Sequence, residues 1–187
     1  MTVQEYENQI NNYELKKRAL ISELDSLSDK IRSKCTPYIK EKIKSVVEFT
    51  VRDNPDITKS LSKEQLTSLK SKMNTAISET ESKLTEAFSS KKFYENINIR
   101  YKIDLTDKSR NYFVDLLETI VSPINKIMLT YYKGCYGIRF SDLDHNILQD
   151  IKLYGQKCNQ YLDIILDIEQ CQENKEKQEA EDIWNNI

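Results

Sequence analysis

The feature that most constrains this chain is a seven-residue apolar repeat, which occurs once near its start and again towards its end. The a-type and d-type positions of the first repeat hold Val3, Tyr6, Ile10, Tyr13, Lys17, Leu20, Leu24, Leu27 and Ile31. Those of the second repeat hold Ile147, Ile151, Tyr154, Cys158, Tyr161, Ile165 and Ile168. Side chains at this spacing form one stripe along a helix, and the stripe faces another helix. Both segments are therefore predicted to be long helices that act through helix–helix contacts.

The composition favours a mainly α fold. Of the 187 residues 31% are charged, and there are only 3 Gly and 3 Pro, which suits long helices with few turns. The hydrophobic fraction of 39% is low for a compact globule and fits helices that stay largely solvated. We therefore expect an elongated helical bundle or coiled coil formed by the long N-terminal and C-terminal helices.

Three stretches in the middle of the chain alternate apolar and polar residues, which is typical of half-buried strands. They are residues 47–52, residues 97–105 and residues 135–140. A lone strand leaves its backbone groups unmatched, so these stretches would pair into a small two- or three-stranded sheet. The alternative is a wholly helical fold in which the same stretches are connectors.

Capping and turn signals mark where helices begin and end. Thr36-Pro37 predicts that the first helix turns or kinks there. Ser62-x-x-Gln65 is a capping box that opens another helix. Ser122-Pro123 predicts a break in the helix that follows Thr106 or Asp107, and Ser141 is the predicted start of the last helix.

These signals suggest four parts. Residues 1–52 hold the coiled-coil-like first helix and a short second helix or strand, and residues 53–140 hold the central helices with the possible sheet. Residues 141–175 form the second coiled-coil-like helix. Residues 176–187 form a charged tail that includes the single tryptophan.

The sequence offers little for catalysis. Three glycines are too few to write a phosphate-binding loop or a dinucleotide fingerprint. The single histidine, His145, follows Asp142 and Asp144, and these carboxylates fit the first turn of a helix better than a metal site, which needs three or four ligands. A pair of Cys135 and His145 has no evident third residue to orient it. We therefore predict a protein that is not an enzyme, with no cofactor, no metal and no small-molecule substrate.

One segment is basic. Between Asp29 and Lys44 six basic residues face only two acids, which gives a local net charge of +4 in a chain whose net charge is -2. Such a face can track a phosphate backbone, although lysines at helical spacing also form ordinary solvated faces. A nucleic-acid-associated subunit is therefore the alternative function, with contacts at Lys30, Arg32, Lys34, Lys40, Lys42 and Lys44.

The last segment is acidic, and the second apolar repeat ends at Ile168, before the end of the predicted helix. From Asp163 onwards eight acids face Lys175 and Lys177, a net charge of -6. Ile183 and Trp184 follow this solvated stretch, and an aromatic anchor after a polar spacer is typical of docking segments. The alternatives are that the helix frays there or that Trp184 packs on the first helix of its own chain.

The remaining signals concern location. The most apolar stretch, residues 112–132, contains charges and a proline, so we interpret it as a buried core helix and expect no membrane span. The four cysteines are far apart and the start of the chain is polar, which favours the cytoplasm over secretion. Taken together, these signals predict a non-enzymatic assembly or adaptor protein that binds protein partners or itself, as a homo-oligomer or a small subunit of a larger complex. Its expected contact residues are Ile151, Tyr154, Cys158, Tyr161, Ile165, Ile168, Ile183 and Trp184.

Overall fold

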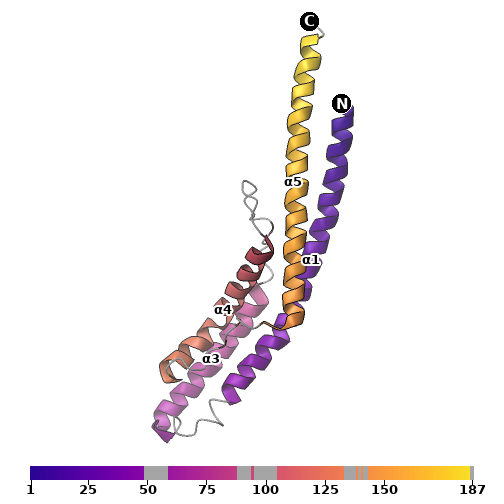
Figure 1. Ribbon diagram of the computed structural model, residues 1–187. Helices are drawn as coiled ribbons and strands as arrows, with labels where there is room; N and C mark the ends of the chain where they lie inside the picture. The colour runs from indigo at the N-terminus through magenta and orange to yellow at the C-terminus, as the bar shows by residue number, and fades with distance from the viewer. Residues whose placement is uncertain are drawn as a thin grey trace. The chain divides into compact units, whose positions relative to one another are not determined.

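The computed structural model describes residues 1–48, 59–87, 94, 105–132, 138, 140 and 143–185 (Figure 1). Nearly all of these residues lie in four α-helices. The helices are α1 (Val3–Glu48), α3 (Lys63–Ala87), α4 (Leu105–Tyr132) and α5 (His145–Asn185). The predicted mainly α class is thus confirmed, and within the described ranges there is no strand.

Side-chain caps set where the helices begin. At α3 the predicted capping box is confirmed: the Ser62 amide donates to Oε1 of Gln65 at 2.8 Å, and the Gln65 amide donates to Oγ of Ser62 at 3.2 Å. Thr2 and Glu5 make the same reciprocal pair at the start of α1. The cap of α5 is Asp144, whose Oδ1 accepts from the Asn146 amide at 2.8 Å. The last helix therefore begins at His145 and not at Ser141.

The turn predicted at Thr36-Pro37 and the break predicted at Ser122-Pro123 are both wrong, and a kink at Pro37 stays a prediction. α1 continues through Pro37 to Glu48, and α4 continues through Pro123 to Tyr132. Proline removes one backbone donor from a helix, but long flanking turns that pack on other helices can outweigh that loss. Thr36 does not cap a new helix, because its hydroxyl donates back to the Arg32 carbonyl at 3.0 Å. The same continuity places Val47 and Glu48 in a helix, so no strand begins at residue 47.

The predicted sheet is not supported. Ile138 and Phe140 are both buried, as their alternation implied, but neither lies in a strand. The backbone partner of Ile138 is a side chain: Asn125 Nδ2 donates to its carbonyl at 2.9 Å, and Asn125 Oδ1 accepts from its amide at 2.7 Å. This two-point clamp on α4 satisfies the groups that a neighbouring strand would have bonded. Residues 49–52 and 97–104 lie outside the described residues, and Leu105 is the first residue of α4.

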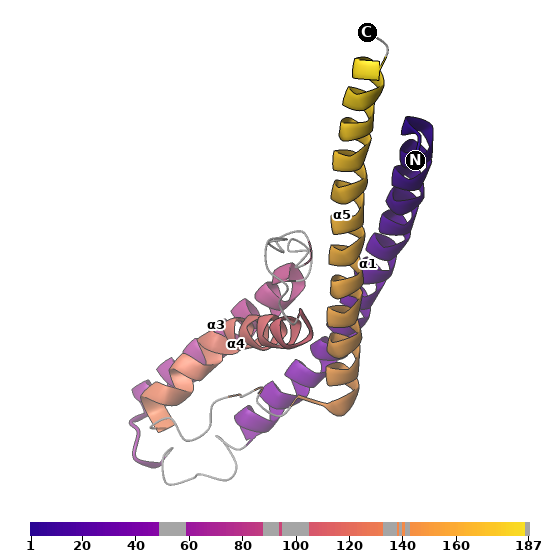
Figure 2. The same cartoon turned by 45° about the horizontal axis from the view of Figure 1, so that its top comes forward.

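The helices belong to two compact units. Unit 1 contains residues 1–28, 92–109 and 151–187, and unit 2 contains residues 29–91 and 110–150. The core of unit 1 is a helix pair in which residues 3–28 of α1 lie beside α5, and the C-terminal end of α5 extends beyond the start of α1 (Figures 1 and 2). The predicted apolar stripes meet inside this pair, and their buried members are Leu20, Leu24, Ile151, Tyr154, Cys158 and Ile168.

Two further contacts complete unit 1. Tyr94 is 2% exposed, its hydroxyl donates to Oδ1 of Asp25 at 2.7 Å, and its ring packs edge-on against Tyr161 with centroids 5.3 Å apart. The first turn of α4 packs on α5 at Gly155. A Cβ atom at Gly155 would lie 2.5 Å from Cα of Thr106 and 2.9 Å from the Leu105 carbonyl oxygen, so only glycine allows this approach.

Unit 2 is a bundle of α3 with residues 29–48 of α1 and residues 110–132 of α4, and α3 and α4 lie side by side (Figure 2). The segment predicted as a core helix is confirmed in that role, since α4 contributes more buried apolar side chains than its neighbours in this unit. These are Phe113, Leu117, Ile120, Val121, Ile124 and Met128. Thr80 is fully buried on α3, and its hydroxyl is satisfied there because it donates to the Ala76 carbonyl at 2.7 Å.

The close approach at Gly155 generates a stability prediction. In a solvated helix Gly→Ala stabilises by about 1 kcal/mol. Here the methyl group would meet backbone atoms of Thr106 and Leu105, which cannot move aside without displacing α4. We expect Gly155→Ala to lower the free energy of unfolding by about 1–3 kcal/mol in urea titrations. Lys152→Ala, at an exposed position one turn earlier on α5, is the control and should change it by less than about 0.5 kcal/mol. A stabilised Gly155→Ala protein would contradict this packing.

Candidate protein-interaction surface on the antiparallel helix pair

Three contacts fix the direction and register of the helix pair in unit 1. Lys175 Nζ lies 2.9 Å from Oε1 of Glu7, and Lys157 Nζ lies 2.7 Å from Oε2 of Glu23. Between them, Sγ of Cys171 donates to Oε1 of Gln9 at 3.5 Å. Residue numbers fall along α5 as they rise along α1, so the helices are antiparallel. Residues on α5 that point towards α1 at this end of the pair are therefore those near Cys171 and Lys175.

Trp184 lies on the other side of α5. It follows Lys175 by nine residues, which is about two and a half turns of an α-helix. A half-turn offset directs its indole away from the side on which Lys175 meets Glu7. Its side chain is 76% exposed, and that of the adjacent Ile183 is 67% exposed. Packing of Trp184 on the first helix, one of the alternatives drawn from the sequence, is thus wrong. Fraying is also wrong, because α5 continues to Asn185.

In the part of the chain that the structure describes, the exposed large apolar side chains lie in one unit. Among the described residues they are Met1, Leu15, Leu153, Ile183 and Trp184. All five belong to unit 1, and Leu15 is 63% exposed on the side of α1 that does not carry its buried stripe. Exposed apolar residues on an otherwise polar surface mark contact sites when they gather on one element. Ile183 and Trp184 are adjacent, so they form the strongest such site.

The predicted contact residues of the second repeat fall into two groups. Ile151, Tyr154, Cys158 and Ile168 are buried inside unit 1, and Tyr161 and Ile165 are half-buried there. Their apolar surface is already covered by the chain itself. Ile183 and Trp184 remain the accessible members of that predicted set.

The predicted basic segment is partly neutralised by a distant acid. Lys30 Nζ lies 2.8 Å from Oδ1 of Asp150, and Lys34 Nζ lies 2.5 Å from Oδ2. Asp150 is 6% exposed, and burial alone would raise its pKa. The hydrogen bonds and positive charges of Lys30 and Lys34 outweigh burial and hold the pKa of this carboxyl below its ordinary value. These two lysines therefore anchor the start of α5 to α1 within unit 2.

The other basic residues of this segment do not form one continuous basic surface. Arg32 Nη2 pairs with Oδ1 of Asp29 at 2.9 Å, and Lys42 Nζ lies 5.4 Å from the centre of the Tyr38 ring. Lys40 and Lys44 are exposed. The segment as folded thus offers fewer charges to a phosphate backbone than its sequence suggests.

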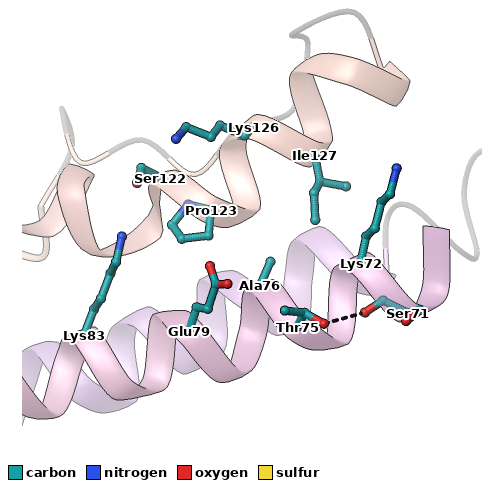
Figure 3. Close-up of a pocket in the computed structure, with 10 residues that line it drawn as sticks. All are labelled: Ser71, Lys72, Thr75, Ala76, Glu79, Lys83, Ser122, Pro123, Lys126 and Ile127. Carbon is teal, nitrogen blue, oxygen red and sulfur yellow. Dashed lines mark hydrogen bonds between the residues drawn. The ribbon is translucent and has the colours of Figure 1, made fainter. Parts of the chain in front are cut away.

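A second basic feature is a groove of about 370 Å³ between α3 and α4 (Figure 3). Lys72 and Lys83 extend from α3 and Lys126 from α4, with the carboxylate of Glu79 between the helices. All four charged side chains are exposed. An exposed, hydrated lysine binds an anion weakly, because solvent screens its charge. We therefore interpret the groove as a solvated face of unit 2.

The described thiols and the histidine show no catalytic arrangement. Burial raises the pKa of Cys35 and of Cys158 to about 12, and a hydrogen bond to Ser109 only partly offsets it at Cys158. Such thiols stay protonated and unreactive near neutral pH. His145 is exposed beside Gln149 on α5. Cys135 lies outside the described residues, and among those that are described no three His, Cys, Asp or Glu side chains could share a metal ion.

Comparisons add no relative from which function could be transferred. No family model, curated protein or solved structure matches this chain. In the described part of the chain, no helix combines the length and apolar character needed to cross a membrane.

The buried carboxylate in unit 2 leads to a pH-dependent prediction. Because the folded-state pKa of Asp150 lies below its ordinary value of 3.8, its ion pairs stabilise the fold above that pH. This stabilisation is lost as the pH falls through the lowered folded-state pKa. We expect Asp150→Asn to lower the free energy of unfolding at pH 7 by about 1–3 kcal/mol. The difference from wild type should shrink as the pH drops below about 4.

Urea titrations between pH 7 and pH 2.5 would measure this difference. Asp115→Asn, at an exposed position on α4, is the matched control and should have little effect at any pH. A destabilisation by Asp150→Asn that stays constant over the whole range would show that Asp150 acts by packing and not by charge.

Proposed function

We propose that this chain is a non-enzymatic adaptor or assembly protein, and that unit 1 supplies its contact with a protein partner. The observation that carries this proposal is the position of Trp184, which is 76% exposed on a continuous helix and directed away from the helix that α5 packs on. A tryptophan in that setting contributes nothing to the core of its own unit. It is the residue type that contributes most to binding when a partner covers it.

The internal packing supports the same assignment. The chain buries its apolar stripes within unit 1, so a partner meets the outer side of the helix pair and not the stripes themselves. We therefore assign the main contact to Ile183 and Trp184. Three buried, free thiols in the described residues fit a reducing compartment, and a cytoplasmic location is part of this proposal.

A nucleic-acid-associated role is the second candidate. It draws on Lys40, Lys42 and Lys44, which are exposed on α1. It is less favoured, because Lys30 and Lys34 are paired with Asp150. Titration with a generic DNA duplex separates the two candidates: a nucleic-acid binder gains affinity steeply as salt is lowered, and an adaptor does not bind.

The adaptor proposal predicts the size of the native assembly. In extracts of its native host, the tagged full chain should sediment well above the 22.0 kDa of one chain. An Ile183→Ala, Trp184→Ala double variant should shift most of the protein to the slower species, since hot-spot truncations commonly cost about 2 kcal/mol or more, a roughly thirtyfold loss of affinity.

Gln160→Ala is the control, because Gln160 is exposed on the same helix away from both residues. It should leave the sedimentation unchanged. Wild-type chain that sediments as a monomer in extract would overturn the proposal.

A further inference from the structure

We propose that the side of α5 around Trp184 docks on a basic protein surface that contains an apolar pocket for the indole. This inference rests on the proposed adaptor function and names the chemistry of its partner. We call this side of the helix the Trp184 face. It comprises Trp184 with the residues one, two and three turns before it, namely Glu173, Lys177, Ala180 and Glu181.

The Trp184 face is shaped to present one large apolar group. Ala180 is the residue four positions earlier on the same side, and its small side chain leaves the indole uncovered. All five members of the face are exposed. Ile183 adds a second exposed apolar side chain directly beside Trp184. A partner therefore needs a pocket for the aromatic ring and a further apolar contact for the neighbouring aliphatic side chain.

The charge around the Trp184 face selects the kind of partner. Residues 169–185 contain six acids and two lysines, which gives a local net charge of -4. Lys175 is further committed within its own unit, with Nζ 2.9 Å from Glu7 and 3.4 Å from Glu179. The acids on this segment are Glu169, Glu173, Glu176, Glu179, Glu181 and Asp182.

An anionic partner would be repelled by this charge. Nucleic acid and acidic lipid surfaces both carry high negative charge, and the same segment of a second copy, residues 169–185, carries -4 as well. A surface rich in Lys and Arg is complementary, and such complementarity both speeds association and favours the correct partner. The negative charge of residues 169–185 therefore favours a basic protein surface over nucleic acid, acidic lipid or a second copy of this chain.

The helix that carries the face is already ordered. Gln178 Nε2 donates to Oδ1 of Asp182 at 2.9 Å, and Lys175 pairs with Glu179 one turn earlier. These contacts link positions four residues apart and stabilise the helix before any partner is bound. A preformed helix loses little conformational entropy on binding, so more of the free energy of its contacts appears as binding affinity.

Site-specific photo-crosslinking identifies the occupant directly. The full chain would carry a benzophenone amino acid at position 180, beside an intact Trp184, and would be irradiated in its native host. We expect crosslinks to peptides of another protein that lie in a Lys- and Arg-rich surface. Trp184→Ala in the same chain should abolish them, and Gln160→Ala should not.

The charge requirement has its own matched variants. The captured protein would be purified, and its affinity for the chain would be measured at several salt concentrations. Replacing Glu173 and Glu181 by Gln should weaken binding at least about tenfold at low salt and reduce its salt dependence. Replacing Asp163 and Asp167 by Asn removes the same charge elsewhere on α5 and should have a much smaller effect.

Several results would overturn the inference. Crosslinks to a second copy of this chain, to lipid, to nucleic acid or to an acidic protein surface would each do so. So would the absence of any crosslink while the chain still sediments as a large assembly, because the partner contact would then lie elsewhere. In that last case the assembly role stands, but the Trp184 face and the assignment of the main contact to Ile183 and Trp184 both fail, so the two proposals are distinguished.

Discussion

The antiparallel contact between α1 and α5 is the interaction on which unit 1 depends. Leu24, Tyr154 and Cys158 are buried in this unit, and ion pairs such as Lys175–Glu7 join the two helices. Because the apolar stripes are covered inside one chain, they are not available as a zipper for another chain. The proposed contact surface is therefore what remains on the outside of this pair, and Trp184 is its largest apolar member.

Periodicity predicted the parts of the fold in which burial follows sequence spacing. The stripes of the two long helices and the capping box at Ser62 are local patterns with direct physical causes, so they could be read from the sequence. Alternation at Ile138 and Phe140 correctly indicated burial but not the backbone partner, which is the Asn125 side chain thirteen positions away. A strand pattern reports which side chains are buried and says nothing of what bonds the backbone.

The features that could not be predicted from the sequence depend on contacts between segments that are far apart in the chain. Lys30 and Lys34 read as part of a basic face because Asp150, some 120 positions away, gives no local signal. Gly155 lies inside a long helix, where glycine is unfavourable. An unfavourable residue at this position is the one feature of the sequence that indicates the close approach of α4. Trp184 and Ile183 were predicted as contact residues because they follow a polar, charged stretch, and the structure adds the side of the helix on which Trp184 lies.

The central claim is that α1 and α5 pair within one chain and in this register. Gln9→Cys tests it most directly, because Gln9 already contacts the thiol of Cys171. Mild oxidation should give a disulfide within a single chain, seen as a faster-migrating monomer on a non-reducing gel and as a linked peptide pair containing residues 9 and 171. Placing the cysteine instead at Glu5, whose side chain is occupied in the cap of α1, should give far less of the product. Disulfide-linked dimers, or no linkage at all, would contradict the antiparallel pair.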